Sequence, residues 1–370
     1  MKRVGYLYEK ICDMDNLRLA HQNARRGKTW YSEVKMVDEN IDYYLAELQK
    51  MLLNQTYHTS EYTIFEIKDG EKIRQIYKLP YYPDRICQWA ILQIIEPYLL
   101  KRFTDDTYSA IPNKGIHYGA NKVKHQLAHD NENCQYCLKL DVKKYYPSID
   151  REILKAQYRR IFKDKKLLWL IDEIIDSPKV GTGVPIGNYL SQYSGNLYLS
   201  WFDHWIKEEK QVKYYHRYMD DVVIFGKDKQ ELRELFQEIK KYLSDNLHLQ
   251  VKSNWQIFPT YKRGVDFLGY RFFGDHTILR KKTIIQIRKK SRKVLAKIEN
   301  GERLTLHDYQ SIQSYKGWVK YCDGYHVEQK YILPIINEYK KKHKTQNSLQ
   351  NIESDLFSGG DIGDKESDTK

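Results

Sequence analysis

The sequence has few cysteines and no long hydrophobic stretch. Its 370 residues include five cysteines, an odd number that does not suit a disulfide framework. Cys134 and Cys137 form a CxxC pair, but no second Cys or His pair stands nearby at zinc-ligand spacing, so we expect reduced thiols. No run approaches the roughly 18 uninterrupted apolar residues that a membrane helix needs, and the N-terminus lacks the hydrophobic region of a signal peptide. We therefore expect a soluble, cytoplasmic protein with no membrane partner.

The chain carries an excess of positive charge, +13 overall. Residues 345–370 hold six acids and two lysines, a net charge of −4, so the rest of the chain carries +17. Lys and Arg side chains that neutralise phosphates release condensed counterions. The 32 tyrosines, many of them beside basic residues, can stack on bases. This composition favours a nucleic-acid partner, although many lysine-rich proteins without such a partner share it.

The first part of the chain is expected to form helices around one β-hairpin. Asp69-Gly70, a strong hairpin-turn signal, separates two strand-like runs at 63–67 and 72–76. Residues 1–40 are polar and basic and are interpreted as a lead-in segment. Apolar residues at helical spacing predict three helices, at 41–52, 86–98 and 116–127.

The middle of the chain alternates strands and helices, and no internal repeat is found. An apolar strand at 136–140 ends at Asp141, and a second hairpin, from 212–218 and 222–225, carries acids at its tip. The remaining predicted elements are a helix at 167–175, a long helix after Gly187, a helix at 229–245, strands near 249–258 and 265–273, and basic helices from 284 to about 343.

Three acids in this region can form a metal site. Asp220 and Asp221 are adjacent at the hairpin tip, where they would repel each other unless a cation lay between them. Each acid alone has an ordinary interpretation, as part of a β-turn or, for Asp141, as a strand-end cap. Together the three can hold two divalent cations about 4 Å apart, one to activate a 3′ hydroxyl and one to stabilise a pyrophosphate leaving group. Magnesium suits such oxygen ligands.

Seven sequence blocks stand in order along the chain. They are Ile73–Ile76 with Pro83–Arg85, Tyr108–His117, Leu140–Tyr146, Gly183–Gln192, Tyr218–Asp221, Leu249–Lys252 and Phe267–Tyr270. From about Arg74 to about residue 325, these blocks resemble the reverse transcriptases in the order that this family has them, which makes chance agreement negligible. The resemblance implies an α+β fold, a right-hand polymerase with fingers, a palm of antiparallel sheet plus helices, and a helical thumb. It implies an RNA-directed DNA polymerase.

The resemblance also divides the chain into four parts. The basic runs at 288–290 and 292–293 would let the thumb grip a template–primer duplex, although charge runs are usually solvated faces. Tyr315, Trp318 and Tyr321 form an aromatic stripe that we expect to pack as the core of the thumb. No segment resembling a protease, integrase, endonuclease or RNase H is left over. The parts are a basic, helical N-terminal extension at 1–60, fingers and palm at 61–275, the thumb at 276–343, and a disordered acidic tail at 344–370.

Family roles carry over to the matching positions. Asp141, Asp220 and Asp221 would be the catalytic residues, and with Val142 they would make up the metal site for two Mg²⁺ ions, with Mn²⁺ as an alternative. The predicted nucleotide-binding residues are Arg74, Lys144, Tyr145, Tyr146, Ile186, Gly187 and Lys252, and the predicted primer grip is Leu268, Gly269 and Tyr270.

Four of the nucleotide-binding residues have specific expected roles. Arg74 would contact the incoming triphosphate, since a planar bidentate donor suits phosphate oxygens. Tyr146 would lie under the sugar as a steric gate against a 2′ hydroxyl. Lys252 would give a proton or positive charge to the leaving pyrophosphate. Gly187 would let the backbone approach the templating pair closely, because glycine has no side chain.

Ile186 departs from the pattern common in reverse transcriptases, which carry Gln at this position. The Ile-Gly-x-x-x-Ser-Gln form resembles the enzymes of diversity-generating retroelements, in which the substitution accompanies mutagenic copying of template adenines. An amide can hold sugar and base by hydrogen bonds, whereas Ile supplies only contact area. The alternative interpretation is a packing variant with no effect on fidelity.

That subtype implies a template RNA, a primer or cDNA, deoxynucleotides, a small basic accessory protein and a structured retroelement RNA as partners. Two other interpretations of the function stay open. One is a bacterial reverse transcriptase of retron or phage-defence type. The other is a catalytically idle RNA-binding protein derived from a polymerase, although all three carboxylates are present.

Overall fold

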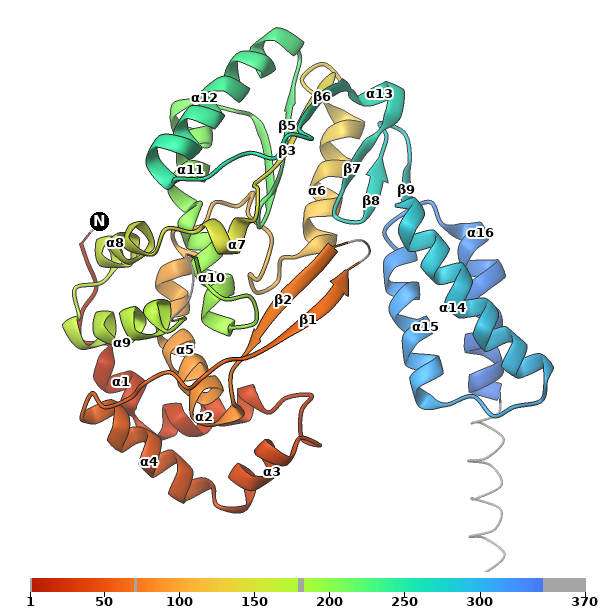
Figure 1. Ribbon diagram of the computed structural model, residues 1–370. Coiled ribbons are helices and arrows are strands. Elements are labelled where there is room, and N and C mark those ends of the chain that lie inside the picture. Colours follow the sequence, from red (N-terminus) through yellow and green to blue (C-terminus); the bar gives the residue numbers. More distant parts are fainter. Residues whose placement is uncertain (1, 70–71, 179–182, 342–370) are drawn as a thin grey trace, which may run out of the picture. The chain divides into compact units, whose positions relative to one another are not determined.

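The computed structural model describes residues 2–69, 72–178 and 183–341 (Figure 1). The chain separates into two compact units, with the division between Lys262 and Arg263. The predicted boundary at 275/276 falls beyond this division, because a small three-stranded sheet that pairs only within itself belongs to the second unit.

A four-stranded antiparallel sheet carries the acids of the first unit. Its order is β4-β5-β3-β6, and β3 and β5 are the central strands (Figure 1). The strand expected to end at Asp141 and the hairpin expected to carry acids at its tip are both confirmed. The strands are β3 (Tyr136–Asp141), β4 (Tyr214–Tyr218), β5 (Asp221–Gly226) and β6 (Gln256–Pro259).

Helices cover both faces of this sheet, which explains why its central strands are almost continuously apolar. Leu138 and Ile224 are register partners on one face, in the same hydrophobic core as Phe236 of α12 (Lys229–Leu247). His216 of β4 belongs to the other face, where its Nε2 pairs with the side chain of Gln126 in α6 (Ile116–His129) at 2.7 Å. The sheet therefore lies between α12 and α6 (Figure 1).

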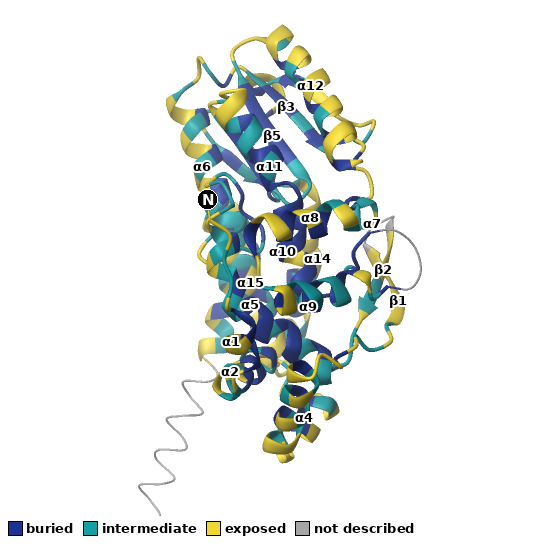
Figure 2. Ribbon diagram, turned by 90° about the vertical axis from the view of Figure 1, so that its left-hand side faces the viewer, coloured by how far each residue is buried: buried dark blue, intermediate teal, exposed yellow. Residues whose placement is uncertain are grey.

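The predicted first hairpin is confirmed as β1 (Thr63–Asp69) and β2 (Lys72–Lys78). The signal residue Gly70 lies outside the described residues. Figure 2 shows an exposed two-stranded ribbon, and its apolar side chains Ile64 and Ile73 are exposed to 54% and 65%. The hairpin therefore presents apolar surface to its surroundings.

Residues 1–40, interpreted as a lead-in segment for which no individual helix was predicted, form three helices, and the predicted helix at 41–52 follows them. Residues 1–60 hold nine basic and eight acidic side chains, so burial rather than charge organises this region. Leu17 and Ala20 are fully buried, and their helix packs on α5, which is apolar nearly all round. The helices are α1 (Tyr8–Cys12), α2 (Met14–Ala24), α3 (Ser32–Glu39), α4 (Ile41–Leu53) and α5 (Ile86–Leu100).

The helix predicted at 167–175 is confirmed, whereas the helices at 81–85, 145–148, 151–161 and 260–263 were not predicted. The long helix expected after Gly187 is three consecutive segments, and the strand expected near 249–258 is limited to β6 and one bridge between Val142 and Val251. Two hydrogen bonds flank this bridge, from the Lys252 N–H to Asp141 O at 2.8 Å and from the Lys143 N–H to Gln250 O at 2.7 Å. The segments are η1 (Tyr81–Arg85), α7 (Tyr145–Ser148), α8 (Arg151–Ile161), α9 (Lys165–Asp176), α10 (Tyr189–Tyr198), α11 (Ser200–His204) and η2 (Trp205–Glu209). The short helix α13 (Thr260–Arg263) contains the division between the two units.

The second unit opens with a hairpin where one strand was expected at 265–273. Leu268 and Gly269 have φ of +52° and +85°, the signature of a two-residue type I′ turn. Leu is unusual at such a φ, which is why the sequence did not signal the turn. The three strands pair in the order β7-β8-β9, and they are β7 (Val265–Phe267), β8 (Tyr270–Phe272) and β9 (Thr277–Leu279).

Helices complete the second unit, as predicted. Aliphatic side chains such as Ile287, Ile312 and Ile335 form their fully buried core. The expected aromatic core is wrong, because Tyr315, Trp318 and Tyr321 are only half-buried. The helices are α14 (Lys281–Glu299), α15 (Leu306–Val319), α16 (Tyr325–Val327) and η3 (Glu328–Ile332), followed by helical residues 333–341.

Two further expectations concern the tail and membrane helices. The tail predicted at 344–370 lies outside them. Within 2–69, 72–178 and 183–341, no helix combines the length and the hydrophobicity that crossing a membrane requires.

Gly269→Ala is expected to destabilise the second unit by about 2–4 kcal/mol, combining the cost of a left-handed φ with overpacking. The added Cβ would lie 2.5 Å from Cζ3 of Trp318. The local free energy of opening, from hydrogen exchange of amides 265–341 in the full chain, measures the loss. Gly301→Ala is the matched control, since its φ is +73° but nothing lies within 4 Å of its Cβ, and it should cost about 1 kcal/mol. Equal losses in the two variants would refute the steric argument.

Candidate active site

The three acids predicted to form a site meet at one end of the four-stranded sheet. Tyr218 pairs with Asp221 across the hairpin of β4 and β5, so Met219 and Asp220 form the turn. Asp141 ends β3 and is the register partner of Asp221. The pairing of β3 with β5 therefore brings together acids that are about eighty positions apart in the sequence.

Repulsion between carboxylates dominates the electrostatics of this site. Burial, and after it the neighbouring Asp141 carboxylate, raises the pKa of Asp220 to about 7. Two lysines partly offset the negative charge. Lys252 Nζ donates to Asp141 Oδ2 at 2.5 Å, and Lys139 Nζ lies 3.7 Å from Asp221 Oδ2.

The donor set suits a hard divalent cation, although the described residues contain no group of three or more His, Cys, Asp or Glu already converged as metal ligands. Asp141 Oδ1 is buried and accepts no hydrogen bond from any described residue. A cation beside it would satisfy that oxygen and would favour ionisation of Asp220. Val142 is buried and apolar, and its N–H donates to Asp220 O at 3.4 Å, so it contributes to this site through its backbone.

A cleft of about 1060 Å³ opens beside the acids. Tyr146 borders it, and its hydroxyl donates to Met219 Sδ at 3.4 Å, so the ring is held against the acid-bearing turn. Tyr145 is buried, and its hydroxyl donates to Gly195 O, so it supports its neighbour. Of the predicted site residues, those that line the cleft are Arg74, Asp141, Lys144, Tyr145, Tyr146, Ile186, Asp220 and Lys252.

Gly187 and the three predicted primer-grip residues are not among the residues that line this cleft. Gly187 has φ of +127°, and a Cβ there would be 2.6 Å from Tyr77 O, so the close approach that requires glycine is to strand β2. The three residues predicted as a primer grip form the turn and the first residue of β8 in the second unit. They are Leu268, Gly269 and Tyr270.

A family comparison decides what this arrangement belongs to. The model of the reverse transcriptase (RNA-dependent DNA polymerase) family matches residues 67–272, which include all three acids and every predicted site residue that lines the cleft. The chain belongs to the reverse transcriptase family. The predicted fold class, an α+β right-hand polymerase of antiparallel sheets and helices, is thereby confirmed.

Curated relatives of this reverse transcriptase are distant. Protein YkfC of Escherichia coli (strain K12) is 24% identical over 245 residues, covering 55% of this chain and 64% of YkfC. The group II intron-encoded protein LtrA of Lactococcus lactis subsp. cremoris is 23% identical over 249 residues, covering 64% of this chain and 39% of LtrA. The chain thus spans less than two thirds of the length of either relative.

Solved telomerase structures are also similar to this reverse transcriptase. Telomerase from Candida albicans, in complex with a TWJ fragment of telomeric RNA, has a TM-score of 0.47 and 12% identity over 78% of this chain and 62% of that chain. Apo telomerase from Candida tropicalis has a TM-score of 0.46 and 12% identity over 61% of this chain and 49% of that chain.

The sequence interpretation missed Lys139, the cation beside Asp221. It stands two positions before Asp141 in β3, and alternate residues of a strand share a face. Strand periodicity could therefore have placed Lys139 beside the acids.

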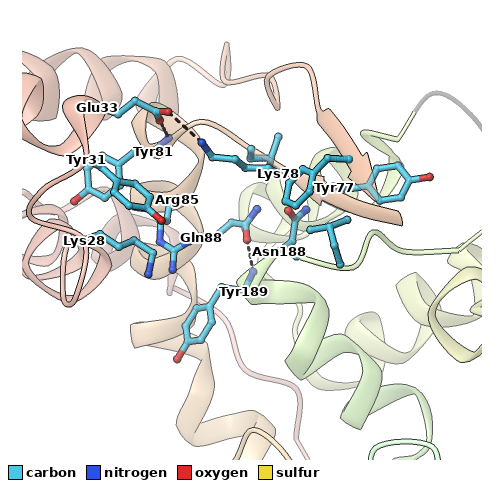
Figure 3. A pocket seen from close by; sticks show the side chains of 14 residues that line it. Lys28, Tyr31, Glu33, Tyr77, Lys78, Tyr81, Arg85, Gln88, Asn188 and Tyr189 are labelled. Carbon is cyan, nitrogen blue, oxygen red and sulfur yellow. Dashed lines mark hydrogen bonds and ion pairs between the residues drawn. The ribbon is translucent and has the colours of Figure 1, made fainter. Parts of the chain in front are cut away.

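A second, smaller pocket of about 140 Å³ was also not predicted (Figure 3). Lys28 and Arg85 both border it, and Arg85 Nε is buried and donates no hydrogen bond to any described residue. Burial, and after it the charge of Arg85, lowers the pKa of Lys28, and burial lowers the pKa of Arg85. Two cations that disfavour each other would both be stabilised by an anion. The pocket also has the aromatic rings of Tyr31 and Tyr189 on its walls.

Proposed function

We propose that the chain is an RNA-directed DNA polymerase that copies an RNA template into cDNA. The observation that carries this proposal is the meeting of Asp141, Asp220 and Asp221 beside a cleft, in a chain of the reverse transcriptase family. Template RNA, a primer strand and deoxynucleotides are the corresponding partners.

Reverse transcriptases generally use divalent metal ions, and here the carboxylates of Asp141, Asp220 and Asp221 would hold them. Two Mg²⁺ ions, or Mn²⁺ in their place, would supply Lewis acidity to the attacking 3′ hydroxyl and to the leaving pyrophosphate. Lys252 places its amine inside the cleft, where it would give a proton or positive charge to the pyrophosphate.

Other cleft residues would orient the nucleotide. Arg74 presents a guanidinium from β2, suited to the triphosphate oxygens. The ring of Tyr146 would contact the sugar as a steric gate, and the hydrogen bond from its hydroxyl to Met219 Sδ would fix the position of the ring. A ring held in place excludes a 2′ hydroxyl by volume rather than by a hydrogen bond.

Purified protein with Mg²⁺ should extend a DNA primer on an RNA template. Asp220→Asn should lower the extension rate by about 100-fold or more, because it removes a charged ligand from the reacting centre. Gel-resolved extension of a labelled primer measures the rate. Asp245→Asn, at an exposed position on α12, is the matched control and should extend as wild type does. Equal activity of wild type and Asp220→Asn on every primed template would exclude the proposed site.

The subtype we favour is the reverse transcriptase of a diversity-generating retroelement, which would copy template adenines with low fidelity. Ile186 lines the cleft, and its carbonyl accepts a hydrogen bond from the Tyr77 N–H at 2.9 Å, so the backbone there is fixed by β2. Its side chain offers no hydrogen bond to a base or sugar. A small basic accessory protein and a structured RNA belong to the same proposal. The similarity to LtrA supports a group II intron-type enzyme as the competing subtype.

Ile186→Gln should lower misincorporation opposite template adenine by about five- to tenfold, the value of one added hydrogen bond. Sequencing of cDNA copied from a defined RNA gives the error spectrum. Ile186→Leu is the control, because it keeps an apolar side chain of equal size, and its spectrum should match that of wild type. An unchanged spectrum in Ile186→Gln would remove the fidelity argument and leave the polymerase proposal intact.

The second pocket is a candidate contact for the unpaired template strand. Lys28 and Arg85 would hold a phosphate, while Tyr31 and Tyr189 offer rings for base stacking (Figure 3). Gln88 Oε1 accepts the Tyr189 N–H at 2.9 Å and so fixes the start of α10 at the pocket wall.

Lys28→Ala should weaken binding of single-stranded RNA and make the slope of log affinity against log salt shallower by about 0.7, the value for one lost phosphate contact. Fluorescence anisotropy over a salt series measures both quantities. Lys241→Ala removes an equal charge from the exposed surface of α12 and should leave the slope unchanged. The same slope in wild type and Lys28→Ala would show that Lys28 does not touch the RNA.

A further inference from the structure

Arg217, in β4, is a charged side chain with no solvent exposure. Its partner Asp203, in α11, is also fully buried. Arg217 Nε donates to Asp203 Oδ1 at 2.6 Å and Nη2 donates to Oδ2 at 2.5 Å, a bidentate pair. Such a pair is costly to bury unless its remaining hydrogen-bonding groups are also satisfied.

Asp203 is fully engaged by its surroundings. Besides Arg217, it accepts hydrogen bonds from the Tyr215 hydroxyl at 2.6 Å and from Thr107 Oγ1 at 3.0 Å. The backbone of Arg217 is fixed as well, since its N–H donates to Asp106 O at 2.9 Å and its carbonyl accepts the Tyr108 N–H at 3.1 Å. The guanidinium is therefore held at a fixed place behind the turn that carries the acids.

One arm of this guanidinium points at the turn itself. Arg217 Nη1 donates to Met219 O at 2.9 Å. Met219 has φ of +56°, in the left-handed region that a residue with a side chain seldom adopts. Its carbonyl belongs to the planar peptide that leads into Asp220, so a bond on that oxygen fixes the direction in which Asp220 leaves the turn.

The same turn also reaches the predicted sugar gate. Met219 Sδ accepts the hydroxyl of Tyr146, and it lies 3.1 Å from where a Cβ of Gly195 would be. A side chain at position 195 would crowd the Met219 sulfur, which would have to shift by a few tenths of an ångström. A shift of the Met219 peptide would move both a metal-binding acid and the ring beside it.

We propose that Arg217 is a positioning residue, which holds the Met219–Asp220 peptide so that Asp220 faces Asp141. Asp203 is the counter-ion that offsets the cost of burying the Arg217 charge. This inference rests on the proposed polymerase function. The alternative is that the buried Arg217–Asp203 ion pair only stabilises the first unit and has no effect on the position of Asp220.

Arg217→Lys separates these explanations, because it keeps the charge while one amine cannot bond Asp203 in two places and Met219 O as well. Mn²⁺ affinity, read from the EPR signal of free Mn²⁺, should fall about tenfold, as for other residues that orient metal ligands. The kcat of primer extension should fall about 100-fold, the effect of displacing a reacting group by about 1 Å, with a much smaller change in the KM for deoxynucleotide. Urea denaturation of the same samples reports their stability.

Tyr215→Phe is the matched control. It removes one donor from Asp203 and leaves the bond from Arg217 to Met219 in place. It should lower stability while Mn²⁺ affinity and kcat stay within about twofold of wild type, because metal affinity responds to groups that orient the ligands. If Arg217→Lys does not fold, Arg217→Met combined with Asp203→Leu removes both charges and leaves no unpaired one. That double variant should show the same loss of Mn²⁺ affinity.

Wild-type Mn²⁺ affinity and kcat in a folded Arg217→Lys protein would overturn the inference. So would losses in Tyr215→Phe that match those of Arg217→Lys in proportion to stability. A wild-type protein that extends no primer would instead refute the proposed function, and the Mn²⁺ comparison would still decide whether Arg217 positions the acids.

Discussion

The antiparallel register between β3 and β5 is the constraint on which the site depends. It pairs Asp141 with Asp221, and it also pairs Leu138 with Ile224 inside the hydrophobic core. Because side chains alternate along a strand, a slip of one residue would turn Leu138 and Leu140 out of the core and carry Asp141 to the opposite face. The burial of ordinary aliphatic side chains thus fixes the place of the carboxylates.

This arrangement brings three carboxylates close together, although their mutual repulsion is unfavourable for the folded state. The raised pKa of Asp220 records the cost, and lysines at 139 and 252 offset part of it. Behind the turn, Arg217 and Asp203 are buried as a neutral pair with their hydrogen bonds satisfied. Active sites commonly hold such unfavourable groupings, and the surrounding structure compensates for them.

Much of this organisation could be predicted from the sequence, and the failures have physical causes. The strand ending at Asp141 was visible because both of its faces are buried, and the first hairpin because Asp69-Gly70 is a common turn. The helices within 1–40 were missed because such short helices depend on tertiary packing. The turn at Leu268 was hidden by an unfavourable residue, and the partner of Arg217 stands fourteen positions away on another element.

Tyr77 has a consequence for how the two pockets communicate. It borders both the large cleft and the small pocket with Lys28, and its N–H holds the carbonyl of Ile186. Its own carbonyl rests against Gly187, with no space for a side chain between them. Tyr77 therefore forms part of the wall of both pockets. If the two pockets bind template and nucleotide as proposed, a base in the small pocket would press on a residue that also borders the nucleotide cleft, and binding of the two would be coupled through Tyr77.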